Sequence, residues 1–295
     1  MVKYVRWITK NIKRNMVEKT IFISGGNSGI GFDATRNFVH LGASVVWGCR
    51  NLEKAEAAKE KILIEYRNAK IDILNLDLAD IESIEKCALN LIKKYPNLDV
   101  IYNNAGIFRI PRGKTKQNYE LVVGTNLVGT YFLNSLLLKH YQDSQFIFTT
   151  SITAHFNKIN LDDPFFKKRK YGNFKAYGSS KTGINKLVTY WSKYYDKTNV
   201  NFALIHPGIT YTPLIKKAYK SRIFSFCAEV FMRIFFHTSE KASLTALLAV
   251  ERNEKFAYYG PRGPFGISGY PKKKVLSRKY YKGNKNLFSF LESLR

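Results

Sequence analysis

Short apolar runs alternate with longer segments of helical periodicity along most of the chain. The runs, rich in β-branched and aromatic residues, cover positions 20–24, 44–48, 70–76, 98–103, 145–150 and 200–205. The segments with helical spacing between them cover 29–41, 51–66, 80–94, 117–139 and 176–195. Strands that alternate with helices indicate βαβ units and a parallel sheet covered on both faces. We therefore predict a doubly wound α/β fold of the Rossmann type, in which ligands bind beyond the carboxyl ends of the strands.

Length and composition favour a single domain. The chain has 295 residues, 45% of them hydrophobic, and no Pro/Gly/Ser-rich linker divides it. We place the domain at 18–260, between a basic amphipathic leader at 1–17 and a basic aromatic tail at 261–295. The three cysteines lie far apart, which predicts neither a disulfide framework nor a zinc site and favours a reducing compartment such as the cytoplasm.

A glycine-rich loop follows the first strand and opens a helix, with the sequence SGGNSGIG at 24–31. Gly25 permits a tight turn, Gly29 allows the backbone to approach a pyrophosphate, and Gly31 allows close packing of the helix. The free N–H groups of the helix N-terminus suit phosphates. The loop residues predicted to bind a dinucleotide are Gly25, Asn27, Ser28, Gly29, Ile30 and Gly31.

The ends of the second and third strands suggest which dinucleotide is bound. Folds that prefer NAD place an acid after the second strand, but this chain has Gly48 and Cys49 there, followed by Arg50. An arginine can bind the 2′-phosphate of NADP through charge-assisted hydrogen bonds, so NADP(H) is favoured. The alternative is a solvated arginine that opens the helix at 51–66. After the third strand, Asp77 either accepts a bond from the adenine amine or caps the next helix, for which Asp80 is the better candidate.

Tyr177 and Lys181 occur in the string YGSSK and are four residues apart on a predicted helix. Both side chains therefore project from one face and can touch. A lysine ammonium beside a phenol stabilises the phenolate, so we expect Lys181 to lower the pKa of Tyr177. Such a pair is suited to proton exchange with a substrate oxygen.

Several further strings accompany this pair in a fixed order. They are NNAG at 103–106, Asn126 in VVGTNLVG, Ser151 in TTSIT, and HPGITYT at 206–212. Together with the glycine loop and YGSSK, they make residues 18–260 resemble the short-chain dehydrogenase/reductase family. The CR dipeptide after the second strand, the spacing from Ser151 to Tyr177, and HPG are most similar to the branch of retinol dehydrogenases and protochlorophyllide reductases, whose members use NADP(H) on apolar substrates.

The resemblance implies roles for individual residues. Tyr177 would exchange a proton with the substrate oxygen, Ser151 would hydrogen-bond the same oxygen, and Lys181 would bind the nicotinamide ribose. Asn126 would hold a water that links Lys181 to solvent. The remaining residues expected to contact the cofactor are Asp77, Leu78, Asn104 and Gly106 on the adenosine side, and Ile209 and Thr212 near the nicotinamide amide and the phosphates.

The expected reaction is interconversion of a carbonyl and an alcohol on an apolar small molecule. Because TSIT also matches a string of protochlorophyllide reductases, reduction of a carbon–carbon double bond stays open, as does a non-catalytic NADP-binding sensor or scaffold. A retinol-dehydrogenase-like alignment would select Ile152 in place of Ser151, but Ile152 has no polar group. His155 is either a second polar substrate contact or a structural loop residue.

The charge of the chain suggests an anionic partner. The formal net charge is +26, and residues 197–295 hold 18 Lys and Arg against five acids. This excess is typical either of lysine-rich background or of attachment to an anionic membrane surface. In the leader, Val5, Ile8 and Ile12 share a helical face opposite basic residues, which fits a frayed solvated segment or a helix at a membrane surface.

Two other regions carry open alternatives. The expected lid, about 213–237, contains the almost wholly apolar stretch 223–236, which fits a cover over an apolar substrate, an interface between two copies of the chain, or insertion into one membrane leaflet. Residues 255–291 interleave lysines with aromatics. We expect these aromatics to pack against the core, and we expect no nucleic-acid binding, since no recognition module accompanies them.

Overall fold

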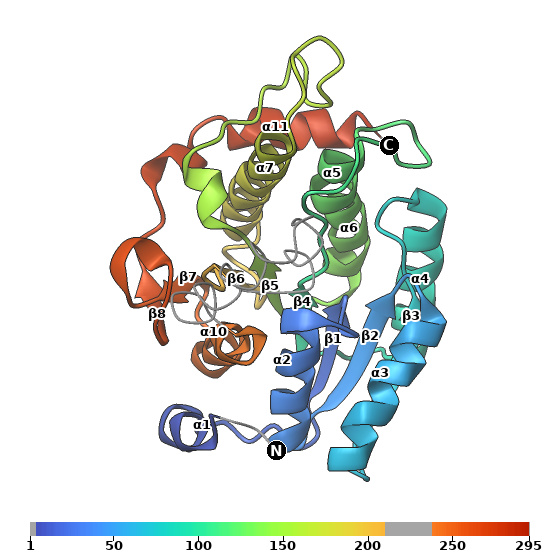
Figure 1. Cartoon of the computed structure of the whole chain (residues 1–295), viewed down its shortest axis with the longest axis vertical. Helices are drawn as coiled ribbons and strands as arrows, with labels where there is room; N and C mark the ends of the chain where they lie inside the picture. Colours follow the sequence, from blue (N-terminus) through green and yellow to red (C-terminus); the bar gives the residue numbers. More distant parts are fainter. Residues whose placement is uncertain (1–3, 210–237, 295) are drawn as a thin grey trace, which may run out of the picture.

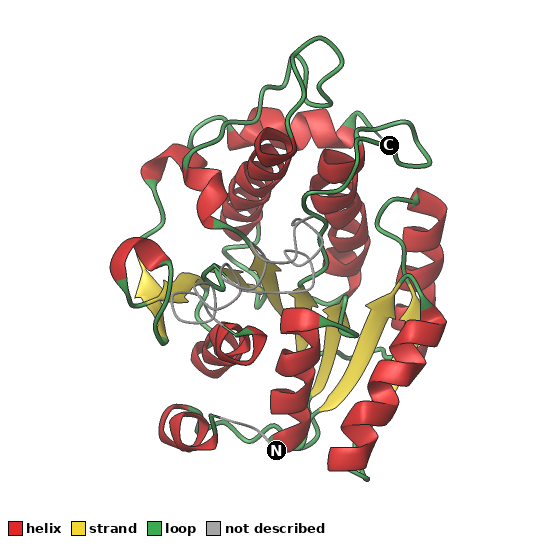
Figure 2. Cartoon of the chain, in the orientation of Figure 1, coloured by secondary structure: helices red, strands yellow, loops and turns green. Residues whose placement is uncertain are grey.

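The computed structural model describes residues 4–209 and 238–294. The expected lid at 213–237 and the predicted cofactor contact Thr212 lie outside the described residues. One mixed sheet forms the centre of the molecule, with helices on both of its faces (Figures 1 and 2).

The sheet has eight strands in the order β3-β2-β1-β4-β5-β6-β7-β8. The first seven are parallel, and β8 pairs antiparallel with β7. The strands are β1 Thr20–Ser24, β2 Ser44–Cys49, β3 Ile71–Asn75, β4 Val100–Asn103, β5 Gln145–Thr149, β6 Asn201–Ile205, β7 Phe256–Pro261 and β8 Pro271–Lys274. The chain order reverses between β1 and β4, which confirms the predicted doubly wound fold and creates a switch point at their carboxyl ends.

Alternate residues of each strand enter two different cores. In β1, Phe22 belongs to the core under α4 (Ile81–Lys94), α6 (Thr130–His140), α7 (Asn173–Tyr194) and α11 (Asn284–Glu292). Its neighbours Ile21 and Ile23 belong to the core under α1 (Val5–Asn11), α2 (Gly29–His40), α3 (Leu52–Glu65) and α10 (Ser239–Arg252). Successive side chains of a strand point to opposite faces, so every buried strand serves both cores.

The helical segment expected at 117–139 contains an irregularity. It begins with the single turn α5 (Leu121–Val123), widens into the π-helix η1 (Gly124–Gly129), and continues as α6. By length and composition the stretch Leu121–His140 could cross a membrane, but 83% of its apolar window is buried inside the protein. It is a core helix, and its widened turn contains Asn126.

The leader packs against the domain, contrary to the interpretation of its sequence as a frayed, solvated segment. Ile8, Ile12 and Met16 are buried in the core beneath α1, α2 and α10. The indole of Trp7 stacks on Tyr270 with ring centroids 5.9 Å apart, and the backbone N–H of Arg14 donates to Glu251. Ile8 and Ile12, two residues of the apolar face that suggested a membrane-surface helix, are therefore covered by the protein itself, whereas Val5 is exposed.

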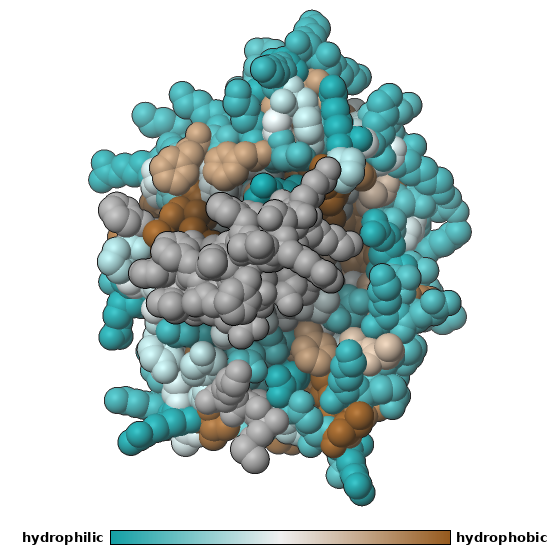
Figure 3. Space-filling model, viewed as in Figure 1, coloured by the Kyte–Doolittle hydropathy of each residue, from teal (hydrophilic) through white to brown (hydrophobic). Residues whose placement is uncertain are grey.

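The chain beyond residue 260 is also part of the fold, so the expected boundary between domain and tail is wrong. It supplies β8, the short 3-10 helices η3 (Pro264–Gly266) and η4 (Arg278–Tyr281), and α11, whose Leu287 and Leu291 are fully buried. Tyr280 is buried as well, while Lys272 and Lys273 are exposed. The prediction that the aromatics pack inward is confirmed, and hydrophilic side chains dominate the face seen in Figure 3.

Candidate active site

The carboxyl ends of four adjacent strands bring the predicted motifs together. Ser24 at the end of β1 pairs with Asn103 on β4, and Thr149 at the end of β5 pairs with Ile205 on β6. The glycine loop, NNAG, Ser151 and HPG each begin at or directly after one of these ends. The parallel register therefore gathers segments that are far apart in the sequence along one edge of the sheet.

The glycine loop is shaped by close contacts as well as by backbone freedom. Gly25 has φ of +69°, a left-handed conformation that favours glycine. A Cβ on Gly31 would lie 2.3 Å from the carbonyl oxygen of Gly25 and 2.6 Å from Nδ2 of Asn104. The Asn104 amide donates to the carbonyls of Ser24 and Gly25, at 3.2 and 3.1 Å. The predicted turn and close helix packing are both confirmed.

The end of β2 lies directly beneath this loop. Gly25 N–H donates to the carbonyl of Gly48 at 2.8 Å, and a Cβ on Gly26 would clash with the indole of Trp47. The thiol of Cys49 accepts from the backbone N–H groups of Gly26 and Asn27, and burial raises its pKa to about 11. A neutral thiol therefore stands where dinucleotide folds specific for NAD carry an acid.

Arg50 is the next residue and is exposed. The interpretation that it opens the following helix is not supported, because Asn51 is the N-cap of α3 and its side chain accepts from Lys54 N–H at 2.7 Å. Ser28, at the N-cap of α2, is also exposed and makes no side-chain cap bond. Within the ranges 4–209 and 238–294, Arg50 forms no ion pair, so its guanidinium and the Ser28 hydroxyl are both available beside the loop.

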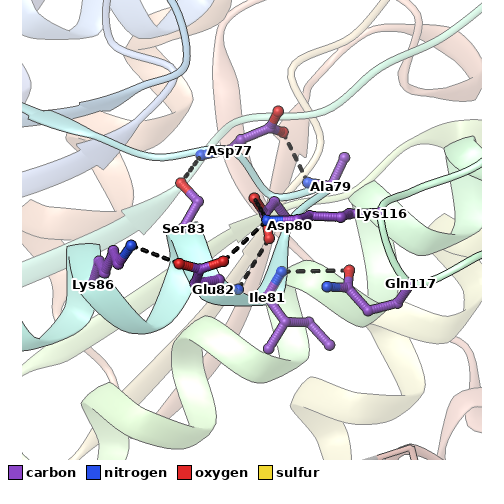
Figure 4. A network of polar contacts seen from close by, with 9 residues as sticks. All are labelled: Asp77, Ala79, Asp80, Ile81, Glu82, Ser83, Lys86, Lys116 and Gln117. Atoms are coloured by element: carbon purple, nitrogen blue, oxygen red, sulfur yellow. Dashed lines mark hydrogen bonds and ion pairs between the residues drawn. The ribbon is translucent and has the colours of Figure 1, made fainter.

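The third strand is followed by a polar network (Figure 4). Asp77 accepts from Ala79 N–H at 2.9 Å, which closes a local turn, and Asp80 caps α4 through Glu82 N–H at 3.1 Å. The preference for Asp80 as the helix cap is thus confirmed. Leu78 is buried, and its carbonyl lies so close to η1 that a Cβ on Gly129 would meet it at 2.1 Å.

Ser151, Tyr177 and Lys181 converge at the end of β5. Ser151 is the N-cap of the short helix η2 (Ile152–His155), and its side chain hydrogen-bonds the Tyr177 phenol. Lys181, one turn further along α7, donates from Nζ to the carbonyl of Thr149 at 2.7 Å. Its Nζ lies 5.7 Å from the centroid of the Tyr177 ring. The structure therefore supports the choice of Ser151 over Ile152.

The protonation of this pair differs from expectation. Burial raises the pKa of Tyr177 to about 12, an effect that the bond from Ser151 only partly offsets. Burial also lowers the pKa of Lys181 to about 8. The net pKa of Tyr177 is therefore raised rather than lowered as expected, because removal of the phenol from water outweighs the effect of Lys181, whose Nζ is bonded to Thr149.

Asn126 clamps the loop that follows β4. Its Oδ1 accepts from Ile107 N–H at 2.8 Å, and its Nδ2 donates to Ile107 C=O at 3.0 Å and to Ser180 Oγ at 3.3 Å. A Cβ on Gly106 would lie 3.3 Å from Asn126 Oδ1 and 3.6 Å from Lys181 Nζ, which places all three residues together. The predicted water-holding role of Asn126 stays a prediction.

Three residues that the sequence did not single out support these groups. Thr149 Oγ1 donates to the Tyr102 hydroxyl at 3.3 Å, and that hydroxyl donates to Asn104 Oδ1 at 3.2 Å. Phe108 packs against Tyr177 with ring centroids 4.5 Å apart. All three lie in or beside apolar runs that reach the carboxyl edge of the sheet. This position is the only feature of the sequence that indicates that they support the site.

The other predicted contacts are less central. The backbone N–H of Ile209 donates to Ile267 C=O, which fixes the chain just after HPG. The carbonyl of His155 accepts from Lys279 Nζ at 2.6 Å, and its ring lies edge-on to Tyr280. Burial and the nearby Lys279 and Lys274 lower the pKa of His155. These contacts fit the interpretation of His155 as a structural loop residue.

The site fits a dinucleotide better than a metal ion. A glycine cradle at a helix N-terminus, an exposed arginine beside it, and a buried tyrosine and lysine at the far side supply donors for phosphates, ribose hydroxyls and a reacting oxygen. Among residues 4–209 and 238–294, no group of three or more His, Cys, Asp or Glu side chains is arranged to hold a metal.

The fold and this arrangement are typical of dinucleotide-binding proteins, and they bring a serine, a tyrosine and a lysine together at the carboxyl edge of the sheet. The chain belongs to the short-chain dehydrogenase/reductase family, whose model, described as short chain dehydrogenase, matches residues 19–222. Members of this family use a nicotinamide dinucleotide as cofactor.

Curated relatives include several retinol dehydrogenases. Retinol dehydrogenase 13 of Homo sapiens is 32% identical over 205 residues, which cover 68% of this chain and 62% of that protein. Retinol dehydrogenase 14 of Homo sapiens is 32% identical over 212 residues, covering 66% of this chain and 63% of the relative. The matched part thus spans less than two thirds of the length of these relatives.

Solved structures share the fold at lower identity. An uncharacterized protein from Mycobacterium paratuberculosis superposes with a TM-score of 0.78 at 24% identity, covering 97% of this chain and 96% of that one. A short chain dehydrogenase from Burkholderia cenocepacia, solved in complex with NADP, has a TM-score of 0.62 at 17% identity, covering 82% of this chain and 94% of that one.

Proposed function

We propose that this protein is an NADP(H)-dependent oxidoreductase that interconverts a carbonyl and an alcohol on an apolar small molecule. The observation that carries the proposal is the buried Tyr177 phenol, hydrogen-bonded to Ser151 and one helical turn from Lys181, at the same sheet edge as the glycine loop. The names of the curated relatives, retinol dehydrogenases, support an alcohol or carbonyl substrate with a large apolar part.

The residues of the chain account for the proton in this reaction. With its pKa raised to about 12, Tyr177 holds its proton at neutral pH and can donate it to a carbonyl oxygen. Ser151 donates a second hydrogen bond toward the same oxygen, which fixes the geometry of the transfer. The chemistry that a nicotinamide cofactor would supply, when bound, is hydride transfer to or from the carbonyl carbon.

Lys181 also contributes to this reaction, next to Tyr177. Its buried Nζ is oriented by the carbonyl of Thr149 and retains two further hydrogens that can reach ribose hydroxyls. Burial lowers its pKa to about 8, so Lys181 remains mostly protonated at pH 7. A charge placed there favours the phenolate that Tyr177 leaves after donating its proton.

The preference for NADP(H) rests on the end of β2. The Cys49 thiol accepts from the backbone N–H groups of Gly26 and Asn27, and the next residue, Arg50, is exposed, as is Ser28 in the loop. A guanidinium and a hydroxyl in that position suit a ribose 2′-phosphate, whereas a carboxylate that would repel it is missing from positions 48–50.

The substitution Tyr177→Phe tests the proposal in an assay of NADPH oxidation with retinoid, steroid and medium-chain carbonyls. We expect turnover to fall by about 10²-fold or more, because the proton donor is lost, while NADPH affinity stays within about twofold. Tyr194→Phe, an exposed tyrosine at the far end of α7, is the matched control. Turnover of the Tyr177 variant within a few-fold of wild type would disprove the assigned role.

The same assay separates the two reductive chemistries. With stereospecifically deuterated NADPH, carbonyl reduction leaves deuterium on a carbinol carbon, whereas double-bond reduction leaves it on a carbon without oxygen. Tight NADPH binding with no oxidation across aldehydes, ketones and enones would favour a sensor over an enzyme.

A further inference from the structure

The side chain of Phe108 covers one side of the catalytic tyrosine. Its ring centroid lies 4.5 Å from that of Tyr177, and the two planes are tilted by 45°. Both residues are half-buried, and Tyr177 also packs against the core beneath α7. A molecule whose oxygen accepts a hydrogen bond from the Tyr177 hydroxyl therefore approaches a ring that Phe108 contacts.

The backbone on either side of Phe108 is held in place. Immediately before it, Ile107 is clamped by Asn126 through both its N–H, at 2.8 Å, and its carbonyl, at 3.0 Å. Immediately after it, Arg109 has φ of +53°, a left-handed conformation that non-glycine residues rarely adopt. The clamp and the turn together fix where the Phe108 side chain leaves the chain, so its ring is a defined wall.

The surroundings of this wall are apolar. Ile107 and Ile110 are half-buried and pack against the same core as Tyr177. Arg109 is exposed to solvent. The known contacts of this stretch are thus with apolar groups and with the ring of Tyr177.

We propose that Phe108 is a specificity-determining residue that favours carbonyl compounds with a flat aromatic or conjugated group next to the carbonyl. Such a group can stack on the Phe108 face while its oxygen bonds to Tyr177, and offset or tilted stacking adds stabilisation beyond burial of area. A saturated ring of the same size makes fewer contacts with a flat face. This proposal rests on the proposed function, since it takes the Tyr177 hydroxyl as the anchor of the substrate oxygen.

Binding of two amides tests the inference without any turnover. Benzamide and cyclohexanecarboxamide each present a carbonyl oxygen to Tyr177, differ in whether the ring is flat, and are not reduced by a nicotinamide. Their dissociation constants are measured by calorimetry on the full-length protein saturated with NADPH. We expect wild type to bind benzamide about three- to tenfold more tightly, and Phe108→Leu to bring the ratio close to one.

Three further variants make the outcome decisive. Phe108→Tyr keeps the ring and should keep the preference, while Phe108→Met replaces Leu if that variant does not fold. Phe174→Leu, an exposed phenylalanine near the start of α7, should leave the ratio unchanged. A wild-type ratio near one, or a preference that survives in both Phe108→Leu and Phe108→Met, overturns the inference.

The proposed function fails separately from this inference. If Tyr177→Phe retained turnover, the assigned proton donor would be wrong, whatever the amide ratio. If the amides showed the preference and lost it in Phe108→Leu, the wall would be established even for a protein that turned over none of the carbonyls tried.

Discussion

The two halves of the site work through different kinds of group. The half at the carboxyl ends of β1 and β2 is built mainly from backbone. Glycines 25, 26 and 31 lie where a Cβ would strain the backbone or meet neighbouring atoms, and Arg50, which follows β2, is exposed. The half at β5 and α7 is made of the side chains of Tyr177 and Lys181, whose pKa values are shifted in opposite directions by removal from water.

This difference shows how each half fails. A main-chain cradle is damaged by adding atoms, because space for the phosphates and for the packing of α2 is what the glycines provide. A side-chain centre is damaged by removing a functional group, even where the replacement packs well. Substitutions in the first half should therefore change cofactor affinity, and substitutions in the second should change turnover.

The largest effect is expected for Lys181→Met. Turnover should fall by about 10²- to 10⁴-fold, because the buried ammonium that favours the phenolate is gone. At pH 7 the free energy of unfolding should rise by up to about 3 kcal/mol, since a buried charge that pays a desolvation penalty is replaced by an apolar side chain. Steady-state kinetics and urea unfolding measure the two, with Lys175→Met, on the exposed face of α7, as the control. If Lys181→Met were less stable than wild type and kept its turnover, the proposed dependence of this half of the site on a buried ammonium would be wrong.

Arg50→Asp should produce the next largest effect, confined to the cofactor. We expect NADPH affinity to fall by about 10- to 100-fold and NADH affinity to improve, because a charge-assisted contact with the 2′-phosphate is replaced by repulsion. Fluorescence titration of both nucleotides measures this. Arg67→Asp makes the same charge change at an exposed site near the end of α3 and should alter neither affinity. An unchanged preference in the Arg50 variant would refute the assignment of NADP(H).

Gly31→Ala should weaken NADPH binding by about tenfold, since the added Cβ would lie 2.3 Å from Gly25 O and displace the loop. The maximal rate at saturating NADPH should stay within a few-fold of wild type. Gly172→Ala adds a methyl that lies 3.9 Å from the nearest atoms of Lys175 and serves as the control. If the Gly31 variant instead lost turnover at saturating cofactor, the glycine loop would affect the reaction itself and not only cofactor affinity.

The smallest effect concerns the pH dependence of stability. The pKa of Lys181 falls from 10.5 in the unfolded chain to about 8 in the folded protein. Between pH 8 and 10.5 the unfolded chain binds more protons at Lys181 than the folded protein does. The free energy of unfolding of wild type therefore increases with pH in this range, by about 1.4 kcal/mol per pH unit at most. The stability advantage of Lys181→Met should therefore be constant below pH 8 and vanish by about pH 10.5. Unfolding curves at pH 7, 9 and 10 would show it, and a constant difference over that range would contradict the low lysine pKa.

The order of strands and helices and the positions of the motifs were predictable from local patterns. All six expected strands occur, and the glycine loop, Asn104, Ser151, Tyr177 and Lys181 lie at one sheet edge as expected. Period-two and period-3.6 patterns are local properties, and parallel register then brings the strand ends together.

What failed depended on distant partners. The amphipathic leader reads as a surface segment until α2 and α10 are seen to bury Ile8 and Ile12. The inward packing of the aromatics beyond residue 260 was expected, but the pairing of β8 with β7 and the covering of α7 by α11 were not. A sequence shows that a face is apolar, but not which surface covers it.

The sequence by itself determined the fold class and the glycine cradle, because these follow from spacing along the chain, while its resemblance to a known family implied which side chains react. Only the tertiary structure decided the wall formed by Phe108, the link through Thr149 and Tyr102, and the direction of the Tyr177 pKa. These depend on how much water the folded protein removes from each group, and burial of that kind is a property of the whole packed molecule.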